Sequence, residues 1–319
     1  MKAKQMQKAT DRLSLSFRLK KDLNKNLGAY LMAIAVLLFY ILFMYKPMAG
    51  AIIAFKDYSP REGILGSPWA EEFGLHHFID FFTSAYFPRT MRNTIVISLS
   101  SLIFSFPLPI ILALSINEVK NKAFKKTVQT ISYMPYFISL VVVCSMITLF
   151  TSEKAFIAQI LGWFGFEING NLLNYENAFV PIYVISGIWQ NTGWNCIIYL
   201  AALSSIDTEL YEAARIDGAN RWQQTIHVTI PGISGTVILL FILAVGNIMN
   251  VGYEKVILLY NDLNRNTADV ISSYVYRRGL EQADWSFGTA VGLFNSTINY
   301  ILVVIANKIS RWATGSSLW

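Results

Sequence analysis

The chain has 319 residues, of which 54% are hydrophobic and only 14% are charged. Soluble domains carry about 25% charged residues, so the composition excludes an ordinary soluble domain and indicates an integral membrane protein. The formal net charge of +6 does not indicate nucleic-acid binding, because the basic residues lie mainly at the ends of apolar segments, where they report topology. We therefore expect no nucleic acid among its partners.

Six apolar segments are long enough to cross the hydrocarbon core as helices, which takes roughly 20 residues. They lie at residues 27–45, 93–117, 128–151, 178–203, 232–250 and 288–306, and the fifth can be extended to residue 260. The predicted fold is an all-α membrane protein with six transmembrane helices. Glu254 and Lys255 are the charges closest to a span, and two interpretations stay open for them: the outer end of the fifth span or a polar cavity.

The first segment, 27–45, follows a polar stretch and is longer than the core of a usual signal peptide. No persuasive small-x-small cleavage pattern follows it before Lys46, so we expect a retained membrane helix. Pro107 and Pro109 interrupt the second segment, and Pro135 interrupts the third. Such breaks are tolerated where a membrane helix packs on protein or lines a wet cavity.

The basic residues predict the orientation in the membrane. The cytoplasmic segments are predicted to be 1–26, 118–127, 204–231 and 308–319, which together hold 16 of the 26 Lys and Arg. Positive residues are enriched on the cytoplasmic side, so both termini and the segment 204–231 are assigned there. Arg277 and Arg278 precede the last span, and we interpret them as marking the membrane interface rather than as meeting an acidic sugar.

Polar side chains gather in the last three predicted spans. Amides in hydrocarbon need hydrogen-bond partners, so one interpretation is bonding between helices. The other is a lining for a polar, uncharged solute, because amides bind hydroxyl groups and aromatic rings stack on the C–H faces of a sugar. The candidate lining residues are Trp189, Gln190, Asn191, Trp194, Asn195, Asn247, Asn250, Tyr253, Asn295 and Asn299.

The sequence predicts no catalytic residues and no bound metal. His76 and His77 are adjacent in an outer loop, far from His227, and neighbouring histidines rarely hold a metal without further ligands nearby. The serine-rich stretch 98–105 has no nearby base and is interpreted as helix packing. No G-x-x-x-x-G-K-[ST] phosphate loop occurs in the chain, so we do not expect it to bind ATP by that route.

The segment 204–231 is polar, but its pattern predicts a folded element and not a simple loop. Asp207 is a suitable N-cap for a short helix, and Gly218 can adopt the left-handed conformation that ends one. A second short helix is predicted from Asn220 to about Val228, ahead of Pro231, where the next apolar segment begins. Helix, glycine turn, helix and proline together indicate a docking element at the membrane face.

This segment also resembles the EAA loop of type I ABC importer permeases. The pattern of that loop is Glu-Ala-Ala, three residues, Gly, nine residues, an aliphatic residue, any residue, an aliphatic residue and Pro. The chain carries the spacing at Glu212, Ala213, Ala214, Gly218, Val228, Ile230 and Pro231, and Asp217 directly precedes the glycine. The surrounding sequence, YEAARIDGANRWQ, resembles the carbohydrate branch of these permeases.

The resemblance covers nearly the whole chain after the basic N-terminal residues. The segments at 45–60, 66–69, 92–99, 106–119 and 129–139 are similar to permeases of importers for aldouronates and related complex oligosaccharides. The organisation that this implies is a basic cytoplasmic arm at 1–26, a first transmembrane helix with an extracytoplasmic loop at 27–90, the permease domain at 91–307 and a cytoplasmic tail at 308–319.

The resemblance further implies a transport subunit of a bacterial cell membrane and not an enzyme. In the family, the first helix of the loop is a coupling helix that inserts in a groove of an ATP-hydrolysing subunit. Ala213 and Ala214 would allow close approach there, and Glu212 would meet a basic residue. The implied partners are two ATP-binding subunits that hold ATP and Mg, a second homologous permease, an extracytoplasmic solute-binding protein or lipoprotein, and a carbohydrate. The expected substrate is an oligosaccharide, and the resemblance allows it to contain uronate units.

Two other function classes compete with this interpretation. A secondary transporter of a polar solute, driven by an ion gradient, usually shows duplicated halves and midplane charges, whereas no repeat is evident here. A membrane enzyme acting on glycolipid would need acidic or histidine clusters at the membrane face, and the sequence has none. The secondary transporter is the main alternative, and ATP depletion at a maintained proton gradient separates it from an ATP-driven importer.

Overall fold

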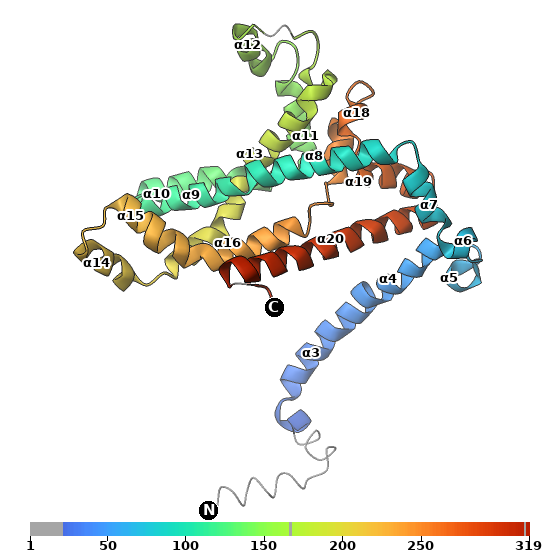
Figure 1. Ribbon diagram of the computed structural model, residues 1–319, viewed down its shortest axis with the longest axis horizontal. Coiled ribbons are helices and arrows are strands. Elements are labelled where there is room, and N and C mark those ends of the chain that lie inside the picture. Colours follow the sequence, from blue (N-terminus) through green and yellow to red (C-terminus); the bar gives the residue numbers. More distant parts are fainter. Residues whose placement is uncertain (1–21, 166–167, 316) are drawn as a thin grey trace, which may run out of the picture.

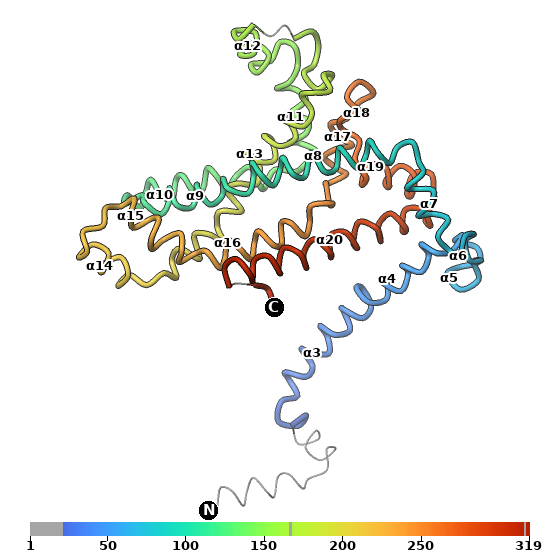
Figure 2. The backbone as a smooth tube through the Cα atoms, viewed as in Figure 1, coloured from blue at the N-terminus to red at the C-terminus, as the bar shows by residue number. Residues whose placement is uncertain are grey.

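The computed structural model describes residues 22–165, 168–315 and 317–319, and in these ranges the regular structure is helical. Most of the predicted basic arm, residues 1–21, lies outside the described residues. Figures 1 and 2 show several long helices running side by side, with short helices at both ends of the bundle and one helix that leaves it.

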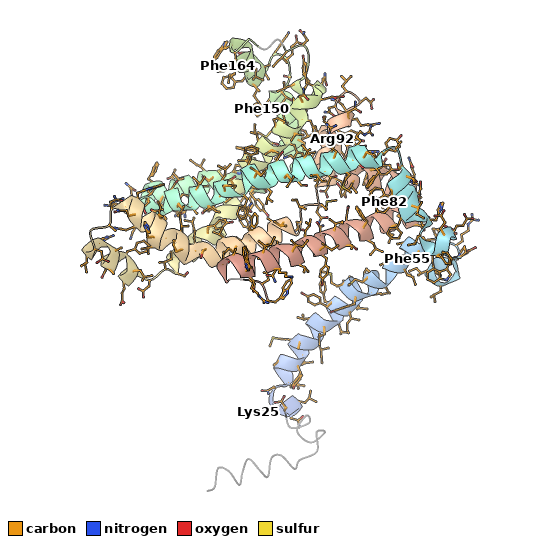
Figure 3. All side chains as sticks on the ribbon, in the orientation of Figure 1. Lys25, Phe55, Phe82, Arg92, Phe150 and Phe164 are labelled. Atoms are coloured by element: carbon orange, nitrogen blue, oxygen red, sulfur yellow. The ribbon has the colours of Figure 1, made fainter. Side chains whose placement is uncertain are left out.

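The helix that leaves the bundle is the first predicted span. It comprises α3 (Leu27–Tyr40), a π turn η1 (Ile41–Tyr45), α4 (Lys46–Ala49) and a 3-10 turn η2 (Gly50–Phe55). Together they form a 29-residue apolar rod that is longer than predicted and buries none of its most apolar stretch within the chain. In Figure 3 its side chains project freely over most of its length, and the rod joins the bundle near Phe55.

The chain is anchored where this rod meets the last helix, α20 (Trp285–Thr314). The hydroxyl of Ser286 donates to the carbonyl of Lys56 over 2.6 Å and accepts from the N–H of Tyr58 over 3.0 Å. Three short helices come next: α5 (Gly63–Gly66), α6 (Glu71–Gly74) and α7 (His76–Thr83). They cover one end of the bundle (Figure 1).

The second predicted span forms one rod of two consecutive helices, with both prolines at the start of the second. It runs from Phe87 to Glu118 over 32 residues and consists of α8 (Phe87–Ser105) and α9 (Pro107–Glu118). Pro107 occupies the first turn of α9, where the missing N–H costs little. The predicted interruption is present as a short break at Phe106, directly before Pro107, but it does not bend the span sharply.

The third predicted span is broken at Pro135, so the predicted interruption is confirmed. It consists of α10 (Lys122–Tyr133), a 3-10 turn η3 (Met134–Phe137) and α11 (Leu140–Phe150), with a bend of 97° between its two parts. Pro135 lies at the break, and the hydroxyl of Ser139 accepts from the N–H of Val142 to start the second part. A proline that ends one helix and a serine that caps the next explain the sharp turn. Two short elements come after it, α12 (Phe156–Trp163) and η4 (Leu172–Asn174).

The fourth predicted span is α13 (Glu176–Ser204), a 29-residue helix at the centre of the bundle. A Cβ on Gly193 would lie 1.9 Å from the carbonyl oxygen of Ser132, so α13 and α10 touch backbone to backbone. In the described chain, four helices are apolar and long enough to span a membrane, or five with the bent pair. The amide-rich α13 is not among them, and six spans stay a prediction.

The segment after α13 is built differently from the prediction. It contains α14 (Thr208–Ile216), α15 (Arg221–Gln224), a π turn η5 (Thr225–Thr229) and α16 (Ile230–Val245). The last three form one 25-residue rod, so the predicted second helix after Asn220 is present, but it is continuous with the next span. Pro231 lies in the first turn of α16, directly after the π turn, and does not interrupt the rod.

The remaining elements close the bundle. The fifth span ends with α16, and α17 (Tyr253–Leu259) is a separate short helix, followed by α18 (Arg265–Ala268), α19 (Ile271–Val275) and a π turn η6 (Tyr276–Glu281). The last helix, α20, extends beyond the predicted 288–306 at both ends. The domain boundaries predicted at 91–307 and 308–319 stay a prediction.

Candidate functional site

The predicted docking element begins with a capped helix at one end of the molecule, opposite α7 (Figure 1). The side chain of Asp207 accepts a hydrogen bond of 3.0 Å from the N–H of Glu209, which satisfies one of the free donors at the start of α14. The predicted N-cap is confirmed.

Gly218 ends α14 in the left-handed conformation, with φ +80°. Its N–H donates to the carbonyl of Arg215 over 3.0 Å, and the N–H of Ala219 donates to the carbonyl of Ala214 over 2.9 Å. This pair of bonds is the Schellman motif. The predicted glycine turn is confirmed, and it bonds the carbonyls of Ala214 and Arg215 at the end of the helix.

Contacts with η5 and with the first turn of α16 hold this element in place. Asn220 and Gln223 form a capping box at the start of α15. The hydroxyl of Tyr211 lies 3.1 Å from the hydroxyl of Thr229. The side chain of Ile206 packs so closely on Gly232 that a Cβ there would lie 2.9 Å from it. A force applied to α14 would therefore reach α16 through packed side chains.

The outer face of this element is exposed and carries large apolar groups. Leu210, Ile216 and Trp222 are 54%, 87% and 72% exposed. Exposed apolar surface of this kind marks an interaction site. Most residues of the pattern are exposed as well: Glu212, Ala213, Asp217, Gly218, Ile230 and Pro231 are exposed, and Ala214 and Val228 are partly buried.

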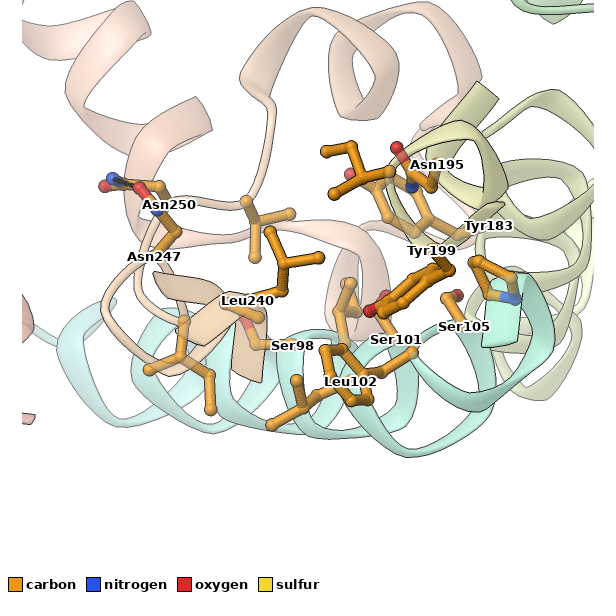
Figure 4. A pocket seen from close by; sticks show the side chains of 17 residues that line it. Ser98, Ser101, Leu102, Ser105, Tyr183, Asn195, Tyr199, Leu240, Asn247 and Asn250 are labelled. Atoms are coloured by element: carbon orange, nitrogen blue, oxygen red, sulfur yellow. Dashed lines mark hydrogen bonds between the residues drawn. The ribbon is translucent and has the colours of Figure 1, made fainter. Parts of the chain in front are cut away.

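Two adjoining cavities of about 430 and 440 Å³ lie within the bundle and share Ser101, Ser105, Tyr183 and Asn195. Volumes of about 300–1,000 Å³ are usual for small-molecule sites. Figure 4 shows the first cavity, where Ser101, Ser105 and Tyr199 gather from α8 and α13, while Asn247 and Asn250 lie together on the segment after α16.

Half of the predicted lining residues face these cavities. Asn195, Asn247 and Asn250 line the first, and Gln190, Asn191 and Asn195 line the second. Within the cavity wall, Asn250 donates to the side-chain oxygen of Asn247 over 3.2 Å, and Asn191 donates to the carbonyl of Gly187 over 2.9 Å. Their role in binding a solute stays a prediction.

The other five predicted lining residues lie outside these two cavities. Trp194 stacks on Tyr136 at 4.5 Å between ring centroids, and Tyr253 stacks on Tyr276 at 5.1 Å. Asn299 accepts a hydrogen bond from the N–H of Met249, and the side-chain oxygen of Asn295 is buried. Trp189 borders a separate apolar groove of about 1,030 Å³ between α11, α12 and α13. Packing between elements accounts for most of these positions.

Several polar groups in the cavity walls were missed from the sequence. Ser98, Ser101 and Ser105 of α8 line the first cavity, and the last two also line the second, although they were interpreted as helix packing. Their spacing of three and four residues places them on one face of a helix, and this was the available signal. Ser98 is buried and its hydroxyl has no hydrogen-bond partner in the described chain.

Lys255 of α17 is also in the wall of the second cavity and is 7% exposed, whereas its neighbour Glu254 is exposed. The ammonium donates to the carbonyl of Tyr183 over 2.9 Å and lies 4.4 Å from the centroid of its ring. Of the two interpretations left open by the sequence, the structure therefore supports the polar cavity for Lys255.

The end of the bundle opposite α14 is held by ion pairs. Asp269 is fully buried and accepts from Arg89 over 3.2 Å and from Arg277 over 2.7 Å. Burial lowers the pKa of the Arg277 guanidinium, but the hydrogen bond and the negative charge of Asp269 outweigh this and raise it. Arg278 pairs with Asp80 and Asp284. Arg277 and Arg278 therefore both form ion pairs with carboxylates of the chain.

Two of the histidines contact oxygen atoms of nearby residues in the chain. The Nε2 atom of His77 lies 3.2 Å from both the carbonyl oxygen of Lys56 and a carboxylate oxygen of Asp57, and Nδ1 of His227 lies 3.0 Å from the carbonyl of Gln223. Across the residues that the structure describes, no group of three or more His, Cys, Asp or Glu is arranged to hold a metal ion.

Comparison with known proteins gives consistent matches. The model of the family described as binding-protein-dependent transport system inner membrane component matches residues 105–314. The polygalacturonan/rhamnogalacturonan transport system permease protein YteP of Bacillus subtilis (strain 168) is 44% identical over 283 residues, which are 88% of this chain and 87% of that protein. Protein LplB of the same organism is 42% identical over 291 residues, 91% of this chain and 90% of its own.

Solved structures give the same result. A chain in the crystal structure of a bacterial ABC transporter involved in the import of the acidic polysaccharide alginate matches with a TM-score of 0.83 and 41% identity, over 93% of this chain and 99% of that one. A second structure, of the bacterial alginate ABC transporter in complex with an alginate pentasaccharide-bound periplasmic protein, matches with a TM-score of 0.82 and 40% identity, over 94% and 100%.

Proposed function

Because this chain belongs to the family of binding-protein-dependent transport system inner membrane components, we propose that it is the permease subunit of an ABC importer that carries a uronate-containing oligosaccharide into the cell. It is a multi-pass membrane subunit with the fold of a type I permease. The chain is a transport subunit and not an enzyme, and the energy of transport comes from partner subunits.

The observation that carries the coupling part of the proposal is the capped and exposed α14 in a chain without a phosphate loop. The importer has two ATP-binding subunits, which hold ATP and Mg, and one of them docks on α14 and α15, where Leu210, Ile216 and Trp222 are exposed. Glu212, Ala213 and Ala214 lie on the docking helix, and Asp217 and Gly218 end it. When the ATP-binding subunits close, α14 moves, and its contact with η5, which continues into α16, passes the movement into the bundle.

The proposed cargo is supported by the relatives and by the cavities. YteP belongs to a polygalacturonan/rhamnogalacturonan transport system, and the transporter of the matched structure is involved in the import of the acidic polysaccharide alginate. A galacturonate unit carries a carboxylate beside its hydroxyl groups. The cavity walls offer amides from Gln190, Asn191 and Asn195 and hydroxyls from Ser101 and Ser105. These hydrogen-bond donors and acceptors can bind the hydroxyl groups at the rim of a sugar ring.

The remaining partners and the orientation complete the proposal. A second homologous permease forms the other half of the pathway, and an extracytoplasmic solute-binding protein or lipoprotein delivers the sugar. One of the matched structures contains such a periplasmic protein. The excess of Lys and Arg in the segments next to the termini and in 118–127 supports a cytoplasmic position for both termini and for α14.

The test is uptake of a labelled oligogalacturonide by cells that express the complete transporter. We expect ATP depletion at a maintained proton gradient to abolish uptake, because the proposed energy source is ATP alone. Uptake that persists under these conditions and stops when the gradient is collapsed would instead identify a secondary transporter. A strain that lacks only this chain serves as the background.

A further inference from the structure

Lys255 differs from the other buried lysine of the described chain in how its ammonium is bonded. Lys56 donates to three carbonyls, those of Ile64, Leu65 and Ser67, at 2.8–3.3 Å. An ammonium has three donors, so Lys56 is fully bonded. Lys255 makes one hydrogen bond, to the carbonyl of Tyr183. Its two other donors are left for whatever occupies the adjoining cavity.

The positive charge of Lys255 also has no counter-charge. None of the ion pairs among the described residues includes it. The cavity that it borders is lined by neutral side chains from each contributing element: Ser101 and Ser105 of α8, Tyr136 and Leu140 around the break before α11, and Tyr183, Gln190, Asn191 and Asn195 of α13. Glu254 is adjacent in sequence but exposed.

A buried charge without an ionic partner is costly, by several kcal/mol even after relaxation of the surroundings. Packing does not require this charge, since an apolar side chain of similar length would fill the same volume. The cost is recovered when an anion enters the cavity. A carboxylate there would accept from the free donors of Lys255 in a charge-assisted hydrogen bond.

The wall of the cavity leaves the ammonium open to such a ligand. Gly187 of α13 also lines the cavity, and a Cβ on this residue would lie 3.6 Å from Nζ of Lys255. A methyl group would thus just touch the ammonium, and any longer side chain would cover it. The absence of a side chain at residue 187 keeps the charge accessible.

We propose that Lys255 binds the carboxylate of the sugar as it passes and makes the permease select anionic over neutral oligosaccharides. This inference rests on the proposed function and names the residue that sets its selectivity. The neighbouring amides and hydroxyls bind the sugar hydroxyls, which charged and neutral sugars share. A lysine is a point charge and does not form the two parallel bonds of arginine, which suits a site that must release its ligand.

The experiment uses the complete transporter, with its partner permease, ATP-binding subunits and solute-binding protein, in proteoliposomes. Initial uptake is measured for trigalacturonate and for its methyl ester, which keeps the size and hydroxyls but has no charge. The solute-binding protein is the same in every assay, so a changed ratio of the two rates belongs to the permease. Lys308→Met, at an exposed lysine of α20, is the matched control.

We expect Lys255→Met to lower the ratio of charged to neutral uptake by about tenfold or more, as for the loss of a hydrogen bond to a charged group. Lys255→Arg keeps most of the ratio, and Lys308→Met leaves it unchanged. Gly187→Leu keeps the charge but covers it, and it lowers the ratio as well. This variant provides the test if Lys255→Met does not assemble.

Two results overturn the inference. An unchanged ratio in an assembled Lys255→Met or Gly187→Leu transporter excludes carboxylate binding by Lys255, and if both rates fall equally the role of the residue is structural only. If the unmodified transporter carries neither sugar, the proposed function fails and the inference falls with it, whereas a failure of the ratio alone leaves the proposed function intact.

Discussion

At the scale of single residues, Asp269 shows how the end of the bundle opposite α14 is held together. It is fully buried, it accepts from Arg89 and Arg277, and its other oxygen accepts from the hydroxyl of Ser273 over 2.7 Å. These bonds join α8 to α18, α19 and η6. Removing the carboxylate would leave two partly buried guanidinium groups without a counter-charge.

We therefore expect Asp269→Asn to destabilise the folded chain by about 3–5 kcal/mol, the usual cost of breaking a buried ion pair. Asp262→Asn is the matched control, because Asp262 is 91% exposed and also pairs with an arginine, Arg265. An exposed pair contributes at most about 1 kcal/mol. Thermal unfolding of the purified protein in detergent measures both, and equal melting temperatures for the two variants would contradict this account of Asp269.

The residues that could be predicted from sequence are those whose role is local. Asp207 and Gly218 are predictable from helix capping, which depends on a few neighbouring residues. The roles of Trp194, Tyr253 and Asn299 could not be predicted, because each depends on a partner far along the chain: Tyr136, Tyr276 and Met249. An amide that lines a cavity and an amide that joins two helices look the same in one sequence.

At the scale of elements, the connection between α14 and α15 carries the coupling role. Gly218 has no atom within 4 Å of the position of an added Cβ, so only its left-handed φ constrains the side chain. A β-branched residue would favour another backbone conformation and would reorient α14 relative to α16. Asparagine tolerates the left-handed region better than other residues that carry a Cβ.

We expect Gly218→Val to cut sugar uptake and transport-coupled ATP hydrolysis while the amount of chain in the membrane stays the same. The left-handed conformation costs about 1–2 kcal/mol for a residue with a Cβ, and this weakens docking roughly tenfold. Gly218→Asn retains most activity. Uptake and ATP hydrolysis in proteoliposomes check this, and full activity of Gly218→Val would count against the coupling role of this turn.

The positions of the long helices could be predicted from apolar length, and the break at Pro135 could be predicted from the proline, but which proline bends its span could not. Pro107 and Pro135 are both prolines in apolar segments, and only the second accompanies a bend, of 97°. The difference lies in the residues after each proline, because Ser139 caps a new helix after Pro135, whereas α9 continues in line from Pro107. In the same way, the predicted helix before Pro231 is continuous with α16 because a π turn precedes the proline.

At the scale of the whole molecule, the isolated chain presents surfaces that suit an assembly. The rod Leu27–Phe55 buries none of its most apolar stretch within the chain. An apolar groove of about 1,030 Å³ lies between α11, α12 and α13, and exposed apolar side chains cover α14 and α15. Lipid or a second permease would cover the first two, and the ATP-binding subunits the third.

The central claim is that α14 lies in the cytoplasm and docks on an ATP-binding subunit, and labelling of Ala213→Cys with a membrane-impermeant maleimide tests it most directly. Ala213 is exposed, and the native Cys144 and Cys196 are buried, so the background is low. We predict labelling in inside-out vesicles that lack the ATP-binding subunits, protection once these subunits are bound, and none from the outside of intact cells. Labelling from outside, or unchanged labelling in the complete transporter, would contradict the claim.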